Sequence, residues 1–257
     1  MSEFNRERLT EIRTIRNITM EQLANSLGKT KQMISKYEVG KSLPSDDTVQ
    51  EIADALSISK DYFYKESTLL SDGSSTLFLR APFTIPKKSR EKCRILSRWG
   101  YEIVREHNDA INPFNSINID NDLSIPEKAM ELRKQWNLGI KPISNMVQLL
   151  ESKGFNIFTI DLQQVKTDAY SQIINGFPII VLNKQIGTAV RQRFSLAHEL
   201  GHMILHRELD DWEFDLRNKE IENEAHQFAE YFLLPTEGFV NTFVSPDFEH
   251  LIMLKKE

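Results

Sequence analysis

Residues 194–206 read FSLAHELGHMILH, and this stretch decides how the second half of the chain is interpreted. Apolar side chains flank its polar centre, which is typical of a buried helix. His198 and His202 stand at positions i and i+4, so both imidazoles share one helix face and can reach one zinc ion. Glu199 would then lie beside the metal, where it can take a proton from a water molecule as general base. The stretch therefore predicts a zinc site with hydrolytic chemistry.

The third zinc ligand has to come from a second helix. His206 continues the histidine series, but a rise of about 1.5 Å per residue puts it roughly 12 Å from His198. No histidine stands six residues after the second one, as the metzincin pattern would need. The segment IENEAHQFAEYFLLP (221–235) offers Glu224 as the first candidate and Glu222 as the fallback, while His226 falls on roughly the other face. The choice between the two glutamates stays open.

The residues around the motif predict an α+β domain over residues 125–257. Runs at 155–160 and 178–182 read as strands, the second almost entirely apolar as a buried strand would be. Helical patterns cover about 125–136, 142–153, 188–207 and 218–234. We therefore expect a small sheet accompanied by helices.

Residues 6–66 predict a separate all-α domain of five short helices. Within it, TMEQLANSLGKTKQMISKYEVG (19–40) has the pattern of two helices joined by a turn centred on Gly28. The polar side of the second helix would face a DNA major groove. Residues 29–41 hold four lysines against the single acid Glu38, so basic charge gathers where phosphates would be. The DNA-binding candidates are Thr30, Lys31, Gln32, Ser35, Lys36 and Lys41.

Length and composition agree with two globular domains. The chain has 257 residues, 40% of them hydrophobic and 27% charged, against about 150 for a typical domain. The N-terminal MSEFNRERLTEIR lacks the apolar core of a secretory signal, and no window offers the roughly 18 apolar residues that span a bilayer. We expect a cytoplasmic protein with no membrane partner. The single cysteine, Cys93, excludes intramolecular disulfides and cysteine-cluster metal sites, and the net charge of -5 argues against a non-specific nucleic-acid coat protein.

Residues 67–124 are expected to form a linker and a connecting helix between the domains at 1–66 and 125–257. SDGSS at 71–75, followed by Pro82 and Pro86, marks the hinge. A helix is expected from about Ser89 to His107. Its segment 93–106 could lie against either domain.

The run 6–66 resembles the Xre/Cro family of phage-type repressor domains. The resemblance rests on Gln22-Leu23-Ala24, Ile34-Ser35-Lys36-Tyr37-Glu38, Gly40-Lys41 and Pro44, which stand at the family's places. It implies sequence-specific binding to operator DNA, commonly as a homodimer. It also implies that Lys31, Gln32 and Lys36 read bases and that the loop at Lys41 contacts phosphate.

Residues 125–236 resemble the ImmA/IrrE family of metallopeptidases. The resemblance rests on Ala129-x-x-Leu132-Arg133, Leu149-Leu150-Glu151-x-x-Gly154, Arg193-Phe194-Ser195-Leu196-Ala197 and Glu224-Ala225-x-x-Phe228-Ala229. It implies a zincin-like, gluzincin-type fold with zinc on His198, His202 and Glu224 and with Glu199 as the base. It further implies that the protein substrate is a helix-turn-helix repressor, cleaved to induce a mobile element or a stress response.

Two other interpretations stay open. The zinc domain could be a non-catalytic sensor or dimerisation module of a transcription factor, or the chain could be an antitoxin-like autorepressor. Glu199 favours the enzyme, because a purely structural zinc site needs no general base. Tyr170 could stabilise an oxyanion, although a tyrosine in a strand is more often part of the core.

Overall fold

The structure is a computed structural model, and it describes residues 3–67, 76–79, 85–107, 117–162, 165, 167–185 and 187–242. The chain divides into two compact units. Unit 1 comprises Met1–Leu69 and Lys87–Leu96, and unit 2 comprises Leu70–Pro86 and Ser97–Glu257. The connecting helix α5 (Lys87–His107) therefore belongs to both, its first half to unit 1 and its second half to unit 2.

The described part of unit 1 is a series of short helices: α1 (Arg6–Ile15), α2 (Met20–Ser26), α3 (Lys31–Glu38), α4 (Asp46–Leu56) and the 3-10 helix η1 (Lys60–Tyr64). Hydroxyl side chains cap several of them: Thr19 and Thr30 accept hydrogen bonds from backbone N–H groups at the starts of α2 and α3. Both helices end where a glycine, Gly28 or Gly40, takes a positive φ. The helix pair predicted over residues 19–40 is confirmed.

An apolar core holds the helices of unit 1 together. Its fully buried members include Leu9, Ile12, Leu23, Ala24, Ile34, Val49, Ile52 and Phe63. An ion pair joins α1 to α3, because Arg13 Nε lies 2.5 Å from Glu38 Oε1. Since the Glu38 side chain is only 5% exposed, the one acid near the lysines of α3 is turned inward and leaves their outer surface basic.

A mixed sheet forms the centre of the described part of unit 2. Its strands are β1 (Leu77–Leu79), β2 (Asn156–Ile160), β3 (Ala169–Ile174) and β4 (Phe177–Asn183), in the order β1-β3-β4-β2. β3 runs antiparallel to both of its neighbours, and β2 runs parallel to β4. Asn175 and Gly176 join β3 to β4 with positive φ angles, as a tight two-residue hairpin turn requires.

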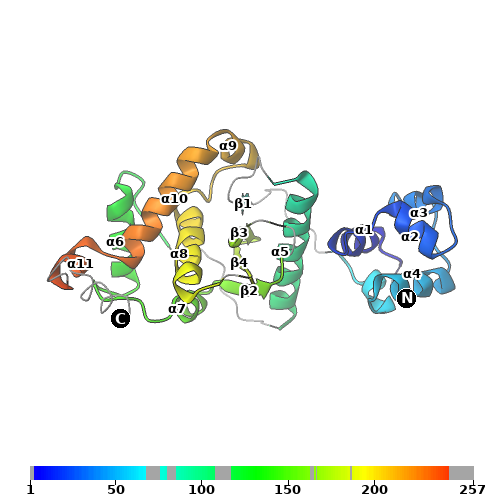
Figure 1. Ribbon diagram of the computed structural model, residues 1–257, viewed down its shortest axis with the longest axis horizontal. Helices are drawn as coiled ribbons and strands as arrows, with labels where there is room; N and C mark the ends of the chain where they lie inside the picture. Colours follow the sequence, from blue (N-terminus) through cyan, green and yellow to red (C-terminus); the bar gives the residue numbers. More distant parts are fainter. Residues whose placement is uncertain are drawn as a thin grey trace. The chain divides into compact units, whose positions relative to one another are not determined.

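Helices cover both faces of the sheet. Figure 1 shows α8 (Ala189–Leu205) on one side and α5 on the other. On the α5 side, a Cβ added to Gly100 would lie 2.8 Å from the ring of Phe158, so helix and sheet are in close contact. On the α8 side, α10 (Asn218–Leu233) packs against α8, and α6 (Ile125–Gln135) packs against α10. The remaining helices are α7 (Met146–Ser152), α9 (Asp211–Leu216) and α11 (Thr236–Thr242).

A buried arginine fixes α6 to the end of α10. Arg133 is 0% exposed, and it donates hydrogen bonds to the carbonyls of Gly139 (2.8 Å), Lys141 (2.5 Å) and Phe232 (2.5 Å). Burial lowers the pKa of its guanidinium. Because a buried charge needs this full set of acceptors, Arg133 holds α10, the helix that packs against α8, in one position relative to α6.

The expected fold class is confirmed: a helical N-terminal region is followed by an α+β region with a small sheet. The strands expected at 155–160 and 178–182 correspond to β2 and β4. β1 lies in the segment that the sequence presents as a linker, so its place in the sheet differs from the expectation. Within the described ranges, the helices lack the length and hydrophobicity of a membrane-spanning segment.

Candidate metal centre and nucleic-acid interface

Helix α8 carries the histidine motif through the buried centre of unit 2. The exposed fractions of His198, Glu199 and His202 are 7%, 3% and 1%. α10 comes close to this part of α8, because a Cβ added to Gly201 would lie 3.1 Å from the carbonyl oxygen of Ala225. The glycine therefore allows side chains of α10 to reach the two histidines.

Three ligand-type side chains converge between α8 and α10. His198 Nε2 and His202 Nε2 lie 3.1 Å apart. His198 Nε2 lies 3.3 Å from Oε2 of Glu222, and His202 Nε2 lies 3.3 Å from Oε1 of the same carboxylate. Among the described residues, this is the histidine and carboxylate cluster whose ligand atoms could hold a metal ion. Both oxygens of Glu222 are buried and accept no hydrogen bond. The donor set fits a cation that would satisfy those oxygens and both imidazoles together.

The structure brings Glu222, rather than Glu224, to the two histidines. Successive residues turn about 100° around a helix, so Glu222 lies about 60° and Glu224 about 100° from Ala225, where α10 meets α8. Glu222 lies nearer to the place where α10 meets α8, so its carboxylate can point between the two helices. The geometry therefore favours the fallback ligand of the sequence analysis over the first candidate.

Glu224 instead pairs with the histidine that the sequence left without a role. His206 Nε2 lies 2.8 Å from Glu224 Oε2, and the other ring nitrogen of His206 lies 3.3 Å from Nδ1 of His202. His206 is 4% exposed. Glu224 and His206 therefore form a chain of polar contacts that ends on the side of His202 turned away from Glu222.

Burial sets the protonation of these histidines. It lowers the pKa of His202 from 6.5 to about 4, although Glu222 acts in the opposite direction. Burial also lowers the pKa of His206, against the effect of Glu224. For Glu222 itself, burial alone would raise the pKa, but His198 and His202 outweigh it and hold that pKa below its usual range. At neutral pH the cluster is thus a carboxylate beside a neutral His202 imidazole, a form suited to binding a metal.

Glu199 is held by a residue that the sequence analysis did not single out. The hydroxyl of Ser171 on β3 donates a hydrogen bond of 2.6 Å to Glu199 Oε2. Both side chains are buried, so the carboxylate has a fixed direction. Because side chains alternate along a strand, Tyr170 faces away from α8 and belongs to the opposite side of the sheet. No sequence signal identifies Ser171, since the contact depends on the register of β3.

An aromatic cluster covers His202. The ring of Phe78 on β1 stacks on the imidazole with ring centres 5.3 Å apart and an interplanar angle of 4°. Phe214 of α9 meets both rings edge-on, at 5.6 Å from Phe78 and 5.8 Å from His202. Phe78 and Phe214 are 2% and 1% exposed. This part of the centre is closed in the structure.

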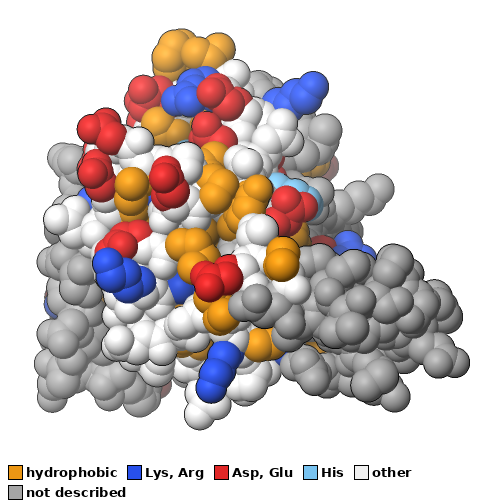
Figure 2. All heavy atoms as spheres, turned by 90° about the vertical axis from the view of Figure 1, so that its left-hand side faces the viewer, with side chains coloured by type: hydrophobic (Ala, Val, Ile, Leu, Met, Phe, Trp, Pro, Cys, Tyr) orange, Lys and Arg blue, Asp and Glu red, His pale blue; other side chains and the backbone are white. Residues whose placement is uncertain are grey.

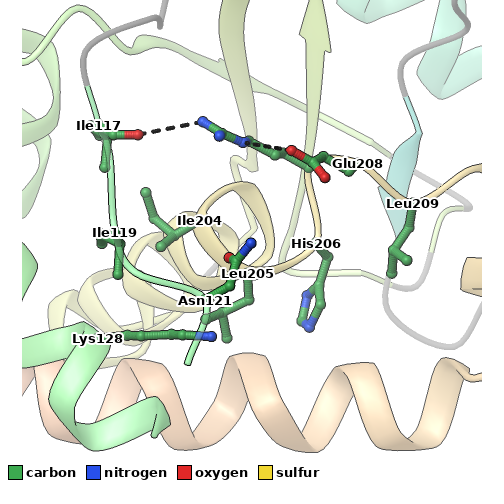
Figure 3. Close-up of a pocket in the computed structure, with 10 residues that line it drawn as sticks. Ile117, Ile119, Asn121, Lys128, Ile204, Leu205, His206, Glu208 and Leu209 are labelled. Atoms are coloured by element: carbon green, nitrogen blue, oxygen red, sulfur yellow. Dashed lines mark hydrogen bonds and ion pairs between the residues drawn. The ribbon is translucent and has the colours of Figure 1, made fainter. Parts of the chain in front are cut away.

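A pocket of about 300 Å³ lies at the end of α8, and His206 is among its lining residues. Figure 3 shows Ile117, Ile119, Lys128 and His206 around it. Arg207 supports its rim by donating a 3.4 Å hydrogen bond to the carbonyl of Ile117. None of His198, His202 and Glu222 lines this pocket, so it is distinct from the metal cluster.

Unit 1 carries the basic surface expected for nucleic acid. Lys31, Gln32 and Lys36 of α3 are exposed, as is Lys41 in the following turn, while Thr30 caps the helix and Ser35 is half-buried. No described residue forms an ion pair with Lys31, Lys36 or Lys41, whereas Lys29 is paired with Glu51 at 3.0 Å. By contrast, the described face of unit 2 seen in Figure 2 mixes acidic, basic and apolar side chains. The candidate phosphate-binding charges therefore lie on unit 1.

Comparisons with known proteins match both halves of the chain. Residues 9–63 match the helix-turn-helix family HTH_3, and residues 150–247 match Peptidase_M78, the IrrE N-terminal-like domain. The two resemblances seen in the sequence are thus confirmed, and the chain carries a helix-turn-helix domain and an IrrE-like domain of a metallopeptidase family.

The curated relatives are named as helix-turn-helix-type regulators. The chain is 36% identical over 59 residues to the SPbeta prophage-derived uncharacterized HTH-type transcriptional regulator YonR of Bacillus subtilis, covering 23% of this chain and 55% of that protein. It is also 36% identical over 69 residues to the HTH-type transcriptional activator BcrR of Enterococcus faecalis, covering 27% of this chain and 33% of that protein. The chain thus spans about half or less of the relatives it matches. No solved structure matches it.

Proposed function

We propose that this protein is a DNA-binding transcriptional regulator whose C-terminal domain is a zinc-dependent endopeptidase that cleaves a repressor-type protein. The observation that carries the proposal is the buried cluster of His198, His202 and Glu222 with Glu199 beside it on α8. The IrrE-like match over residues 150–247 contains all four residues.

The spacing of the cluster supports zinc as its metal. A tetrahedral zinc site with bonds of about 2.0–2.1 Å needs ligand atoms roughly 3.3 Å apart. The two imidazole nitrogens lie 3.1 Å apart, close to this spacing, and His198 and His202 lie 3.3 Å from Oε2 and Oε1 of Glu222, respectively. Three protein ligands are also the number used by catalytic zinc sites, which keep one position for water or substrate. We therefore assign Glu222 as the third ligand in place of Glu224.

Residues beside the three proposed ligands would transfer protons or orient the side chains of the site. Zinc bound here would polarise a peptide carbonyl and make a water molecule more acidic. Glu199 would take a proton from a water molecule and give it to the departing amine, so it would act first as base and then as acid. Ser171 aims the carboxylate of Glu199 through its 2.6 Å hydrogen bond. Glu224 and His206 orient the ring of His202 from behind.

The helix-turn-helix domain supplies DNA binding in this proposal. Lys31, Gln32 and Lys36 would reach base edges in the major groove, because all three are exposed on α3, with Gln32 and Lys36 on the side opposite the buried Ile34. Lys41 and the cap residue Thr30 would contact phosphate. Pairing the two domains in one chain would couple operator binding to cleavage of a partner protein.

The deciding experiment is Glu199→Gln, assayed against helix-turn-helix repressors encoded beside the gene. The amide keeps the size of the side chain and can still receive the Ser171 hydrogen bond, but it cannot act as a base. Zinc content and DNA binding should stay at wild-type levels while cleavage falls by about 10²–10⁴-fold. Equal cleavage by the variant would contradict the enzyme, and equal gene regulation without cleavage would favour a non-catalytic sensor.

A further inference from the structure

Strand β1 precedes the region that matches the IrrE-like domain, yet it belongs to the same compact unit and forms one edge of its sheet. The match to the IrrE-like domain covers residues 150–247, which contain β2, β3, β4, α8 and α10. Residues 77–79 lie between the two matched regions of the chain. They nevertheless pair antiparallel with β3, with Phe78 directly opposite Ser171. The domain thus receives an edge strand from the segment that connects it to the DNA-binding domain.

The register places Phe78 on the catalytic side of the sheet. Residues directly opposite each other on neighbouring strands point to the same face, and Ser171 points at Glu199. Phe78 therefore also faces α8, where its ring stacks on His202. With Phe78 in place, Glu199 is 3% exposed and His202 is 1% exposed. A peptide carbonyl needs access to the metal and to Glu199 together, and this arrangement obstructs that access.

β1 is also fastened at its start. The hydroxyl of Thr76 donates to the carbonyl of Leu209, and the backbone N–H of Leu77 donates to Asp211 Oδ1 at 3.3 Å. Both acceptors lie between the motif helix and Phe214, which packs edge-on against Phe78. The strand is only three residues long, and all three of its side chains are buried. β1 is therefore a short cover that its buried side chains and these two hydrogen bonds hold in place.

We propose that β1 is an internal inhibitory strand, which occupies the place of an extended substrate segment on β3 and covers His202 with Phe78. When β1 leaves, the N–H and C=O groups of the β3 edge can pair with an extended segment of another protein. The substrate residue opposite Ser171 is then aromatic or large and apolar, as Phe78 is. The inference rests on the proposed peptidase function but is tested separately from it.

The test compares the zinc-loaded full-length chain with Phe78→Ala, Phe78→Leu and the control Phe155→Ala. Phe155 is equally buried, at 2% exposed, but it packs with Trp136 in the main core. Three properties are measured for each: zinc content, the rate of zinc transfer to the chelator 4-(2-pyridylazo)resorcinol, and hydrogen exchange of the amides at 169–174. Cleavage of casein is followed in parallel, with and without Glu199→Gln.

If β1 is the cover, Phe78→Ala keeps its zinc but transfers it roughly 10²-fold faster, the factor expected when a buried phenylalanine side chain no longer holds the strand. The β3 amides exchange faster, casein cleavage rises, and Phe78→Leu is intermediate. The control shows none of these changes at β3. Wild-type exchange at β3 and wild-type zinc transfer in Phe78→Ala would overturn the proposal. Absence of zinc, or cleavage that survives Glu199→Gln, would instead refute the peptidase function, and the exchange data would still decide the role of β1.

Discussion

Replacing Glu222 by glutamine tests the assignment of the metal centre most directly. The change keeps the shape of the side chain and removes the charge that both imidazoles face at 3.3 Å. Glu224→Gln is the matched control, because it lies two positions away on the same helix and its carboxylate contacts His206 instead. The two variants differ in which carboxylate they remove and in little else.

The expected effects follow from the distance of each carboxylate to the metal position. Structural zinc sites with four protein ligands bind with about 10–16 kcal/mol, so one ligand contributes about 2.5–4 kcal/mol, or roughly 10²–10³-fold in Kd. Glu224 acts only through His206 on the orientation of His202. Such indirect support is worth about 10-fold to 100-fold at most. We therefore expect Glu222→Gln to weaken zinc binding by about ten times more than Glu224→Gln.

Competition with a chromophoric chelator gives both zinc dissociation constants. Thermal unfolding with and without zinc gives an independent measure, because a ligand raises stability only as far as it binds the folded state. A larger loss of affinity in Glu224→Gln than in Glu222→Gln would refute the reasoning. It would show that α10 presents the other carboxylate to the metal in solution.

Three further predictions follow from the described contacts. Gln32→Ala should weaken operator binding by ~1–3 kcal/mol and relax the sequence preference. Lys41→Ala should weaken binding to all DNA sequences and reduce the slope of log K against log salt concentration by about 1. Footprinting at several salt concentrations checks both variants. In the metal-free chain, burial lowers the pKa of His202 to about 4 from 6.5 in the unfolded chain, so the folded state binds fewer protons between these two pH values. The free energy of unfolding should therefore fall by up to about 3 kcal/mol as the pH drops from 6.5 to 4. A free energy of urea unfolding that stays constant over this range would contradict the prediction. Arg133→Ala leaves three carbonyls without their donor and should lower the free energy of unfolding by at least about 3 kcal/mol. Lys134→Ala, at an 81% exposed side chain, should lower it by less than about 0.5 kcal/mol in the same urea-unfolding measurement.

Local sequence patterns predicted the elements whose signals are local. The helix pair at 19–40 has its caps and its stop glycines in the sequence itself, and β4 is a continuous apolar run. β1 has no such signal, because three residues acquire a strand conformation only by pairing with β3. The helix α5 was expected from about Ser89, but the division of its two halves between different units depends on tertiary contacts.

The candidate site was predictable to the same limit. The spacing of His198 and His202 fixes their common face, and the structure brings them together as expected. The choice between Glu222 and Glu224 depends on how α10 is rotated against α8, and that rotation is set by the close approach at Gly201. The sequence shows that both glutamates lie beside the apolar face of α10. Which part of that face meets α8 depends on tertiary packing.

The parts of the centre that the motif cannot predict come from distant segments. Ser171 reaches Glu199 across 28 positions of the chain, and Phe78 reaches His202 from a strand before the matched domain begins. The motif supplies two of the three proposed ligands and the proposed base on one helix, whereas the contact of Glu199 with Ser171 and the cover over His202 depend on β3 and on its register with β1. A shift of one residue in that register would turn Phe78 to the opposite face. In the structure, the cover over His202 therefore depends on strand pairing, and the proposed inhibitory role of β1 places its control in the segment between the two matched regions.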